Sequence, residues 1–418
     1  MSSQKSNEFW LNQLKEQLKQ QGYSPQTARR QPLVAERFLA YLNEQHIAVE
    51  NAEASNVALY LENELRLFRR RHCHAPRSSR NGWRHSHTAG IHMLLRLAQG
   101  KWPPATVPSN PREVFHREIL GHYDEWMQGF LRLVSGTRCD RCAEASRFLV
   151  WLGERGSNQQ NLLKIMITDV DAYMTFRSES QRRNSLQFLA TNVRSFLRHL
   201  HYAGRIATNL STAVMGPTLY AFESIPSSLR PEDVKAAVET TRKDHSQSGL
   251  RDYAILMLLS SYGLRAGEIT SLRLEDVDWR SDVLRVYHSK TGVHSELPLL
   301  PSVGNAILDY LRKGHPKTQA REIFLISHAP YRPFKSGSCL YWPVRHRLAA
   351  AGVNPAGKRG PHAFRHARAV SMLRAAVSPK GIGDILGHQS ARSTTTYLKL
   401  ATEDLRAVAL EIPGEVSA

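Results

Sequence analysis

One pair of strand-like segments stands among helical patterns, and this pair constrains the fold of the chain most. Residues 283–287 read VLRVY and residues 295–299 read SELPL, with turn residues at 289–292 between them. This arrangement predicts a β-hairpin with Lys290 at or near its tip. A lysine at a hairpin tip is, taken alone, more often solvated than functional. The expected fold class is mainly α with a small β-sheet.

The first half of the chain is patterned as helices, and two of its stretches resemble each other. Trp10, Leu11, Leu14 and Leu18 share one helical face. Residues 38–47, FLAYLNEQHI, are followed 110 positions later by residues 148–157, FLVWLGERGS, and Leu95-Arg96 resembles Leu197-Arg198. A near-constant offset indicates a repeated unit. The alternative is that any amphipathic helix produces an FLxxL pattern.

Turn-forming residues divide the chain into segments. Residues 217–227 contain prolines and serines between helical patterns, which is typical of a linker. Pro231, followed by Glu232 and Asp233, predicts the start of the next helix. We therefore expect an additional N-terminal helical segment at 1–110, a helical domain at 115–216, a linker at 217–227 and an α+β domain at 228–418. In this scheme 1–110 is a candidate duplicate of the domain that follows it.

The charge of the chain points to a polyanionic partner. Its 56 Lys and Arg residues exceed its 37 Asp and Glu residues, which gives a formal net charge of +19. A basic excess spread over folded domains is typical of proteins that bind nucleic acid. The alternative is a protein that merely has a high isoelectric point.

The expected compartment follows from features that the sequence does not show. Its start, MSSQKSNEFW, has no apolar signal region, and no apolar stretch is long enough to span a bilayer. Four cysteines give no disulfide framework, and Cys139-Asp140-Arg141-Cys142 has no partner pair of zinc-ligand spacing. We expect a cytoplasmic, nucleoid-associated protein without a metal site.

Arginines cluster in both halves of the helical region. Guanidinium groups suit phosphate because their planar fork donates paired hydrogen bonds. A solvated charged face is the alternative for any single residue. The arginines expected to contact DNA are Arg69, Arg70, Arg71, Arg77, Arg80, Arg182 and Arg183.

Residues 361–398 carry groups suited to chemistry on a phosphodiester. His362 and Arg365 stand three residues apart, and Leu386-Gly387-His388 is followed nine residues later by Tyr397. A phenol can attack phosphorus, a guanidinium can hold the phosphate oxygens and imidazoles can move protons. Each group also has a structural explanation: a cap for His362, a core position for His388 and an amphipathic helix for Tyr397.

A second arginine stands at a turn farther upstream. Residues 253–259 predict a buried helix that runs into Gly263-Leu264-Arg265-Ala266-Gly267-Glu268. Arg265 follows this helix at a glycine-flanked turn, where its side chain can be directed into a cleft. The alternative is an arginine that only pairs with Glu268.

Taken in order, these residues resemble the catalytic set of the tyrosine recombinase (phage integrase) family. The matching positions are Arg265, Lys290, His362, Arg365, His388 and Tyr397. The resemblance is close over about 228–409 and looser over a helical DNA-clamp (core-binding) domain at about 123–204. A segment before residue 110 departs from a minimal family member. Six motifs in order, in fitting local structure, are specific where any one alone is weak.

The resemblance implies a site-specific DNA recombinase or integrase that serves a mobile element and needs no cofactor. Tyr397 would form a bond to the 3′ phosphate, Arg265, Arg365 and His388 would hold the oxygens, Lys290 would protonate the leaving 5′ oxygen, and His362 would assist proton transfer. It also implies a homo-oligomer, a tetramer on double-stranded DNA, alone or with related recombinases. A tail helix within 398–410 would dock on a neighbouring protomer or on its own domain.

Two other functions remain open from the residues. A type IB-like nicking-closing topoisomerase uses similar groups but relaxes one duplex instead of exchanging strands between two. A DNA-binding protein with a relic active site would form no covalent adduct, and the complete residue set argues against it.

Overall fold

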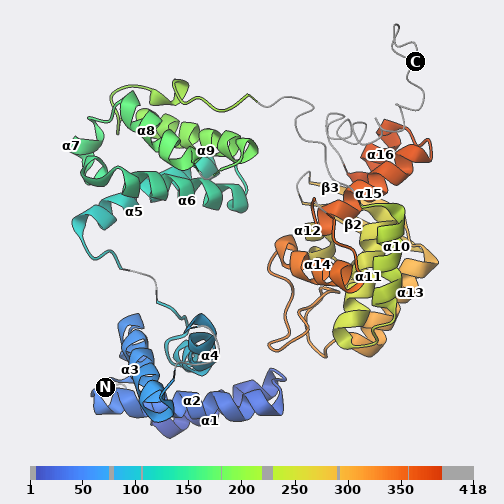
Figure 1. The fold of residues 1–418 in the computed structure, drawn as a ribbon, viewed down its shortest axis with the longest axis horizontal. Coiled ribbons are helices and arrows are strands. Elements are labelled where there is room, and N and C mark those ends of the chain that lie inside the picture. Colours follow the sequence, from blue (N-terminus) through green and yellow to red (C-terminus); the bar gives the residue numbers. More distant parts are fainter. Residues whose placement is uncertain are drawn as a thin grey trace, which may run out of the picture. The chain divides into compact units, whose positions relative to one another are not determined.

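The computed structural model describes residues 6–74, 80–104, 107–179, 181–218, 229–289, 292–355 and 357–387. Over these residues the chain is mostly helical with one three-stranded sheet, as expected from the sequence (Figure 1). The helices and strands pack around separate hydrophobic cores, which are taken in turn below. No helix in the described part of the chain is both long and apolar enough to cross a membrane.

Four helices form the first group. They are α1 (Asn7–Gln20), α2 (Pro25–Glu44), α3 (Ala54–His72) and α4 (Arg80–Gln99). Ser24 accepts a hydrogen bond from the Thr27 backbone N–H, and Pro25 occupies the first position of α2. Both features favour a helix start at this turn. The helices bury one apolar face each, with Leu14, Phe38 and Leu94 almost fully buried.

A second helical group follows, with α5 (Pro111–Gly129), α6 (Ser135–Trp151), the short α7 (Gln159–Leu162), α8 (Ile167–Ser178) and α9 (Arg183–Tyr202). Tyr123, Phe148 and Phe196 fill its core. Cys139 and Cys142 are free thiols on α6, and burial together with Asp124 raises the pKa of Cys142 to about 11. Within the described ranges no three metal-ligating side chains are grouped.

The third group holds the sheet. Its helices are α10 (Pro231–Arg242), α11 (Gln247–Tyr262), α12 (Ala266–Ser271), α13 (Pro301–Asp309), α14 (Tyr341–Ala350), α15 (Pro361–Arg374) and α16 (Pro379–Leu386). α11 is the central helix and packs on α10, α13, α14 and α15. Pro231 stands at the start of α10, as predicted. The domain boundaries themselves stay a prediction.

The predicted hairpin is confirmed, and a third strand, which was not predicted, extends it into a sheet. β2 (Val283–His288) and β3 (Val293–Pro298) are antiparallel, with Leu284 opposite Leu297. β1 (Val277–Asp278) pairs with the other edge of β2. Leu284, Val286 and His288 alternate inward along β2 and are buried. Lys290 lies outside the described residues.

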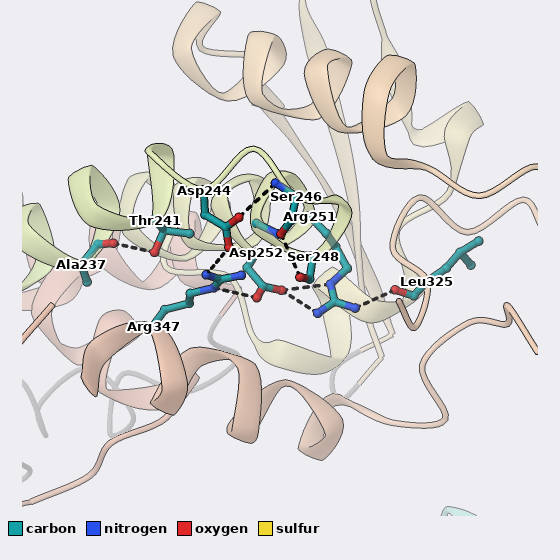
Figure 2. Close-up of polar contacts among 10 residues, drawn as sticks. Ala237, Thr241, Asp244, Ser246, Ser248, Arg251, Asp252, Leu325 and Arg347 are labelled. Carbon is teal, nitrogen blue, oxygen red and sulfur yellow. Dashed lines mark hydrogen bonds and ion pairs between the residues drawn. The ribbon is translucent and has the colours of Figure 1, made fainter. Parts of the chain in front are cut away.

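A buried ionic network ties α11 to α14 (Figure 2). Asp252 accepts hydrogen bonds from Arg251 at 2.7 Å and from Arg347 at 2.8 Å. Arg251 also donates to the Leu325 carbonyl at 3.1 Å. A second oxygen for Arg347 comes from Asp244, whose pKa is lowered to about 2 by hydrogen bonds from Ser246 and then from Arg347. Two buried guanidinium groups thus share one buried carboxylate.

Replacing Asp252 with alanine is expected to destabilise this domain by about 3–5 kcal/mol, because Arg251 and Arg347 would keep buried charge without their shared partner. Hydrogen exchange of the α11 amides in the full chain measures the loss. The control is Asp309→Ala, which removes an exposed pair with Lys313 and should cost under about 1 kcal/mol. Equal effects of the two variants would show that the network does not stabilise the fold.

Candidate active site

Arg265 lies where α11 ends and α12 begins. α11 is capped by Gly263, whose φ of 67° is left-handed and favours glycine. A Cβ at Gly263 would also lie 3.0 Å from the Leu386 side chain. Arg265, two residues on, is the N-cap of α12 and keeps 20% of its side chain exposed. The turn therefore fixes the backbone of Arg265 and leaves part of its guanidinium open to a ligand.

Glu268 holds Arg265 in place. The Arg265 backbone N–H and Nη1 each donate to this carboxylate at 2.7 Å, and only 1% of the Glu268 side chain is exposed. Burial alone would raise the pKa of Glu268, but hydrogen bonds from His288 and Arg265 outweigh it and hold the pKa below its ordinary value. The pairing expected from the sequence exists, and Nη2 of Arg265 has a different partner.

That partner is the backbone at the end of α16. Arg265 Nη2 donates to the Gly387 carbonyl at 3.2 Å. The buried Arg365, on α15, donates from Nη2 to the Leu386 carbonyl at 2.7 Å and from Nη1 to the Gly263 carbonyl at 2.8 Å. Free carbonyls at a helix C-terminus carry partial negative charge and attract cations. Two arginines a hundred residues apart in the chain thus converge on two consecutive carbonyls.

His288 joins the hairpin to the same place. Its ring is fully buried, with Nδ1 2.8 Å from Glu268 Oε1 and Nε2 2.9 Å from Ser295 Oγ. The ionised carboxylate can only accept, so Nδ1 carries the proton. A Cβ at Gly387 would come within 2.6 Å of this ring, so the site requires glycine there. His288 therefore fixes both the end of β2, two residues before Lys290, and the backbone just before His388.

His362 occupies the first turn of α15, on the exposed side of that helix. It lines a cleft of about 420 Å³ together with Tyr341, Arg345 and Lys358. One turn along α15, burial and then the nearby Lys358 lower the pKa of His366 to about 4, so His366 is neutral at pH 7. His362 is thus the accessible imidazole of the two.

The structure describes three of the six residues of the predicted catalytic set. It brings Arg265 and Arg365 together and places His362 on the helix of Arg365. Lys290, His388 and Tyr397 lie outside the described residues, as does the proposed tail helix. Gly387, the residue before His388, is described and contacts Arg265.

The arginines expected to contact DNA occupy separate elements. Arg69, Arg70 and Arg71 are exposed in the last turn of α3. Arg182 and Arg183 are exposed at the start of α9, and Arg183 donates to the Thr218 carbonyl at 3.0 Å. Arg77 and the side chain of Arg80 lie outside the description.

Reasoning from the sequence missed His288. It ended the first strand at Tyr287, whereas β2 continues by one residue. The signal was present, because a strand that buries Leu284 and Val286 also turns its next alternate residue inward. A histidine at that inward position was therefore a candidate for a buried polar contact.

His288→Ala is expected to slow formation of a covalent DNA complex roughly 10- to 100-fold, because small displacements of catalytic groups are costly. His288→Asn, whose amide can still donate to Glu268, should recover much of the rate. The control His294→Ala removes an exposed histidine of the same hairpin and should leave the rate unchanged. If His288→Asn were as slow as His288→Ala, the contact with Glu268 would not position the site.

Known proteins match this chain over the site and beyond it. The Phage integrase family matches residues 227–404. A putative integrase/recombinase of Sinorhizobium fredii (strain NBRC 101917 / NGR234) is 56% identical over 195 residues, which is 46% of this chain and all of that protein. A second putative integrase/recombinase of the same strain is 30% identical and aligns with 71% of this chain and 69% of its own length.

Solved structures share the fold at low sequence identity. A lambda integrase tetramer bound to a Holliday junction has a TM-score of 0.53 and 18% identity, covering 78% of this chain and 88% of that chain. The recombinase XerH bound to its palindromic difH substrate has a TM-score of 0.54 and 12% identity, covering 73% and 98%. The convergence of Arg265 and Arg365 agrees with the sequence matches above. These matches show that this chain belongs to the phage integrase family and is a site-specific tyrosine recombinase.

Proposed function

We propose that this recombinase cuts and rejoins double-stranded DNA through a 3′-phosphotyrosyl intermediate at Tyr397. The phenolic oxygen of Tyr397 attacks the scissile phosphorus, and the bond to the 5′ oxygen breaks. Lys290 supplies the proton that makes this oxygen a 5′-hydroxyl, and His362 assists proton transfer near the nucleophile. Attack by a 5′-hydroxyl of another strand reverses the step and releases Tyr397. Because the phosphodiester energy is retained in the tyrosyl ester, rejoining consumes no ATP.

The observation that supports this proposal most is the meeting of Arg265 and Arg365 at the end of α16. Two guanidinium groups fixed on one helix end can hold the non-bridging oxygens of a phosphate, where charge accumulates in the transition state. His388 follows this helix end directly and is proposed to join them as a donor. Preorganised donors of this kind commonly supply the largest part of catalysis.

We propose that different segments of the chain carry out cleavage and DNA binding. Residues 228–418 would form the catalytic domain, residues 115–216 the DNA clamp with Arg182 and Arg183 on phosphates, and 217–227 the linker. Lambda integrase is known as a dimer bound to a COC′ core site and as a tetramer bound to a Holliday junction. These assemblies support a tetramer of this chain on DNA, alone or with related recombinases, with a tail helix near 398–410 docking between protomers. A relative of this chain is named a putative integrase/recombinase, which supports a role in the movement of a mobile element.

Nicked duplex oligonucleotides tiled across the genomic flanks of the coding sequence test the reaction. A nick beside the scissile phosphate lets the short product diffuse away, so a tyrosyl complex accumulates. We expect a covalent complex on one of these duplexes, and strand exchange between two intact duplexes that carry that site. Relaxation of a single supercoiled plasmid without exchange would instead identify a nicking-closing enzyme, and no complex on any duplex would indicate a relic site.

A further inference from the structure

The four helices of residues 7–99 match four of those in residues 111–202, namely α5, α6, α8 and α9, and the single-turn α7 has no counterpart. Along α1, the buried Trp10, Leu14 and Leu18 recur 109 positions later on α5 as Ile119, Tyr123 and Met127. Along α2, the buried Ala35, Phe38, Leu39 and Leu42 recur 110 positions later, on α6 and at its C-cap, as Ala145, Phe148, Leu149 and Leu152. The match concerns core positions, so it is stricter than the FLxxL pattern of the sequence alone.

The later helices continue the correspondence. Val57 and Tyr60 on α3 recur 113 positions later as Val170 and Tyr173 on α8. On the closing helices, Ile91, Leu94 and Leu95 of α4 stand where α9 has Val193, Phe196 and Leu197. α1 packs on α2 and α4, as α5 packs on α6 and α9.

The two groups also share an arrangement of rings. Phe38 and Tyr60 meet edge to face at 5.2 Å and 71°, and Phe148 and Tyr173 do so at 4.9 Å and 70°. A third ring lies 5.4 Å from each tyrosine: Tyr41 beside Tyr60, and Trp151 beside Tyr173. Matching positions with matching ring geometry indicate one helical unit present twice.

α3 is longer than its counterpart, and the added residues carry a cluster of positive charge. α8 (Ile167–Ser178) corresponds to residues 54–65 of α3, but α3 continues to His72. The added residues 66–72 read RLFRRRH, and we call them the arginine extension. Arg66, Arg69, Arg70 and Arg71 in it are all exposed. No carboxylate pairs with any of the four in the part of the chain that the structure describes.

The corresponding helix of the second unit carries, in its last turn, an arginine that is already paired. On α8, Arg177 is held by the buried Glu144 through two hydrogen bonds of 3.2 and 3.1 Å. Val34 stands at the position of Glu144 in the first unit, and Glu64 at that of Arg177. Four exposed guanidinium groups at a helix C-terminus, where cations are favoured, are suited to the closely spaced phosphates of a duplex.

We propose that residues 7–99 are a second copy of the helical unit at 111–202, and that the arginine extension binds the phosphate backbone of a further stretch of duplex DNA. The proposal rests on the proposed function in one respect, namely that DNA is the polyanion. It adds a DNA contact that the cleavage chemistry does not need.

The test is a full-length variant with Arg66, Arg69, Arg70 and Arg71 changed to Gln. The matched control changes four exposed cations of the same unit, namely Lys15, Lys19, Arg29 and Arg30, to Gln. Binding to a 60-base-pair duplex centred on the cleavage site is measured against salt concentration, with hydroxyl-radical footprints. We expect the slope of log K against log salt to fall by about 3 for the first variant, to change little for the control, and the footprint to shorten on one flank.

A second measurement separates this proposal from the proposed function. On a minimal nicked duplex that carries only the cleavage site and no flanking DNA, the first variant and the control should form covalent complex at the same rate as each other. Equal slopes for variant and control, or an unshortened footprint, would overturn the proposal while leaving the chemistry intact. A footprint that shortened equally in both variants would also overturn it, because general charge would then be responsible.

Discussion

Tyr397→Phe is expected to abolish the covalent DNA complex. The change removes one oxygen, and with it the nucleophile, so the rate should fall by at least about 1000-fold. Incubation with a nicked duplex, followed by denaturing electrophoresis, measures the complex. Binding of the same duplex should stay within about twofold of the unmodified protein, because a single phenol contributes little against many phosphate contacts.

The matched control is Tyr287→Phe, which removes the hydroxyl of an exposed tyrosine on β2. This variant should form the complex at the unmodified rate. A complex of normal yield with Tyr397→Phe would assign the nucleophile to another residue. A loss of complex in both variants would mean that the assay reports on something other than the attacking oxygen.

Arg365→Lys should lower the rate of complex formation by about 100- to 1000-fold, even though the charge is kept. The guanidinium donates to the Gly263 and Leu386 carbonyls from two different nitrogens. An ammonium group lacks this planar fork and cannot donate to both carbonyls and to phosphate with the same geometry. Loss of one preorganised donor to a transition-state oxygen costs an enzyme about that much in kcat.

Single-turnover kinetics on the nicked duplex measure this effect, with a thermal melt to follow folding. Arg374→Lys, at the exposed end of the same helix, is the control and should leave the rate unchanged. A rate for Arg365→Lys within threefold of the control would contradict the role given to the guanidinium fork.

The local features of this fold were predictable because local residues determine them. Ser24 and Pro25 start α2, Pro231 starts α10, and the alternation along β2 marks the hairpin. β1 could not be predicted, because its two residues are too few to show an alternating pattern. They form a strand only through pairing with Val283 and Leu284.

The sequence was enough to predict which residues belong to the site, but not how these residues are arranged in space. Motif order identified Arg265 and Arg365, but their meeting depends on contacts between residues 122 and 21 positions apart. The sequence also could not predict which arginines pair with a carboxylate. Nothing in the sequence distinguishes Arg177 from Arg70, whereas Glu144 neutralises the first and no carboxylate in the described part of the chain pairs with the second.

The most direct test is to identify the atom that carries the DNA. The covalent complex formed on the nicked duplex is digested with protease and nuclease, and the nucleotide-bearing peptide is sequenced by mass spectrometry. The predicted result is a nucleotide joined through its 3′ phosphate to Tyr397, with a free 5′-hydroxyl on the released strand. A nucleotide on any other residue, or a linkage through a 5′ phosphate, would contradict the account.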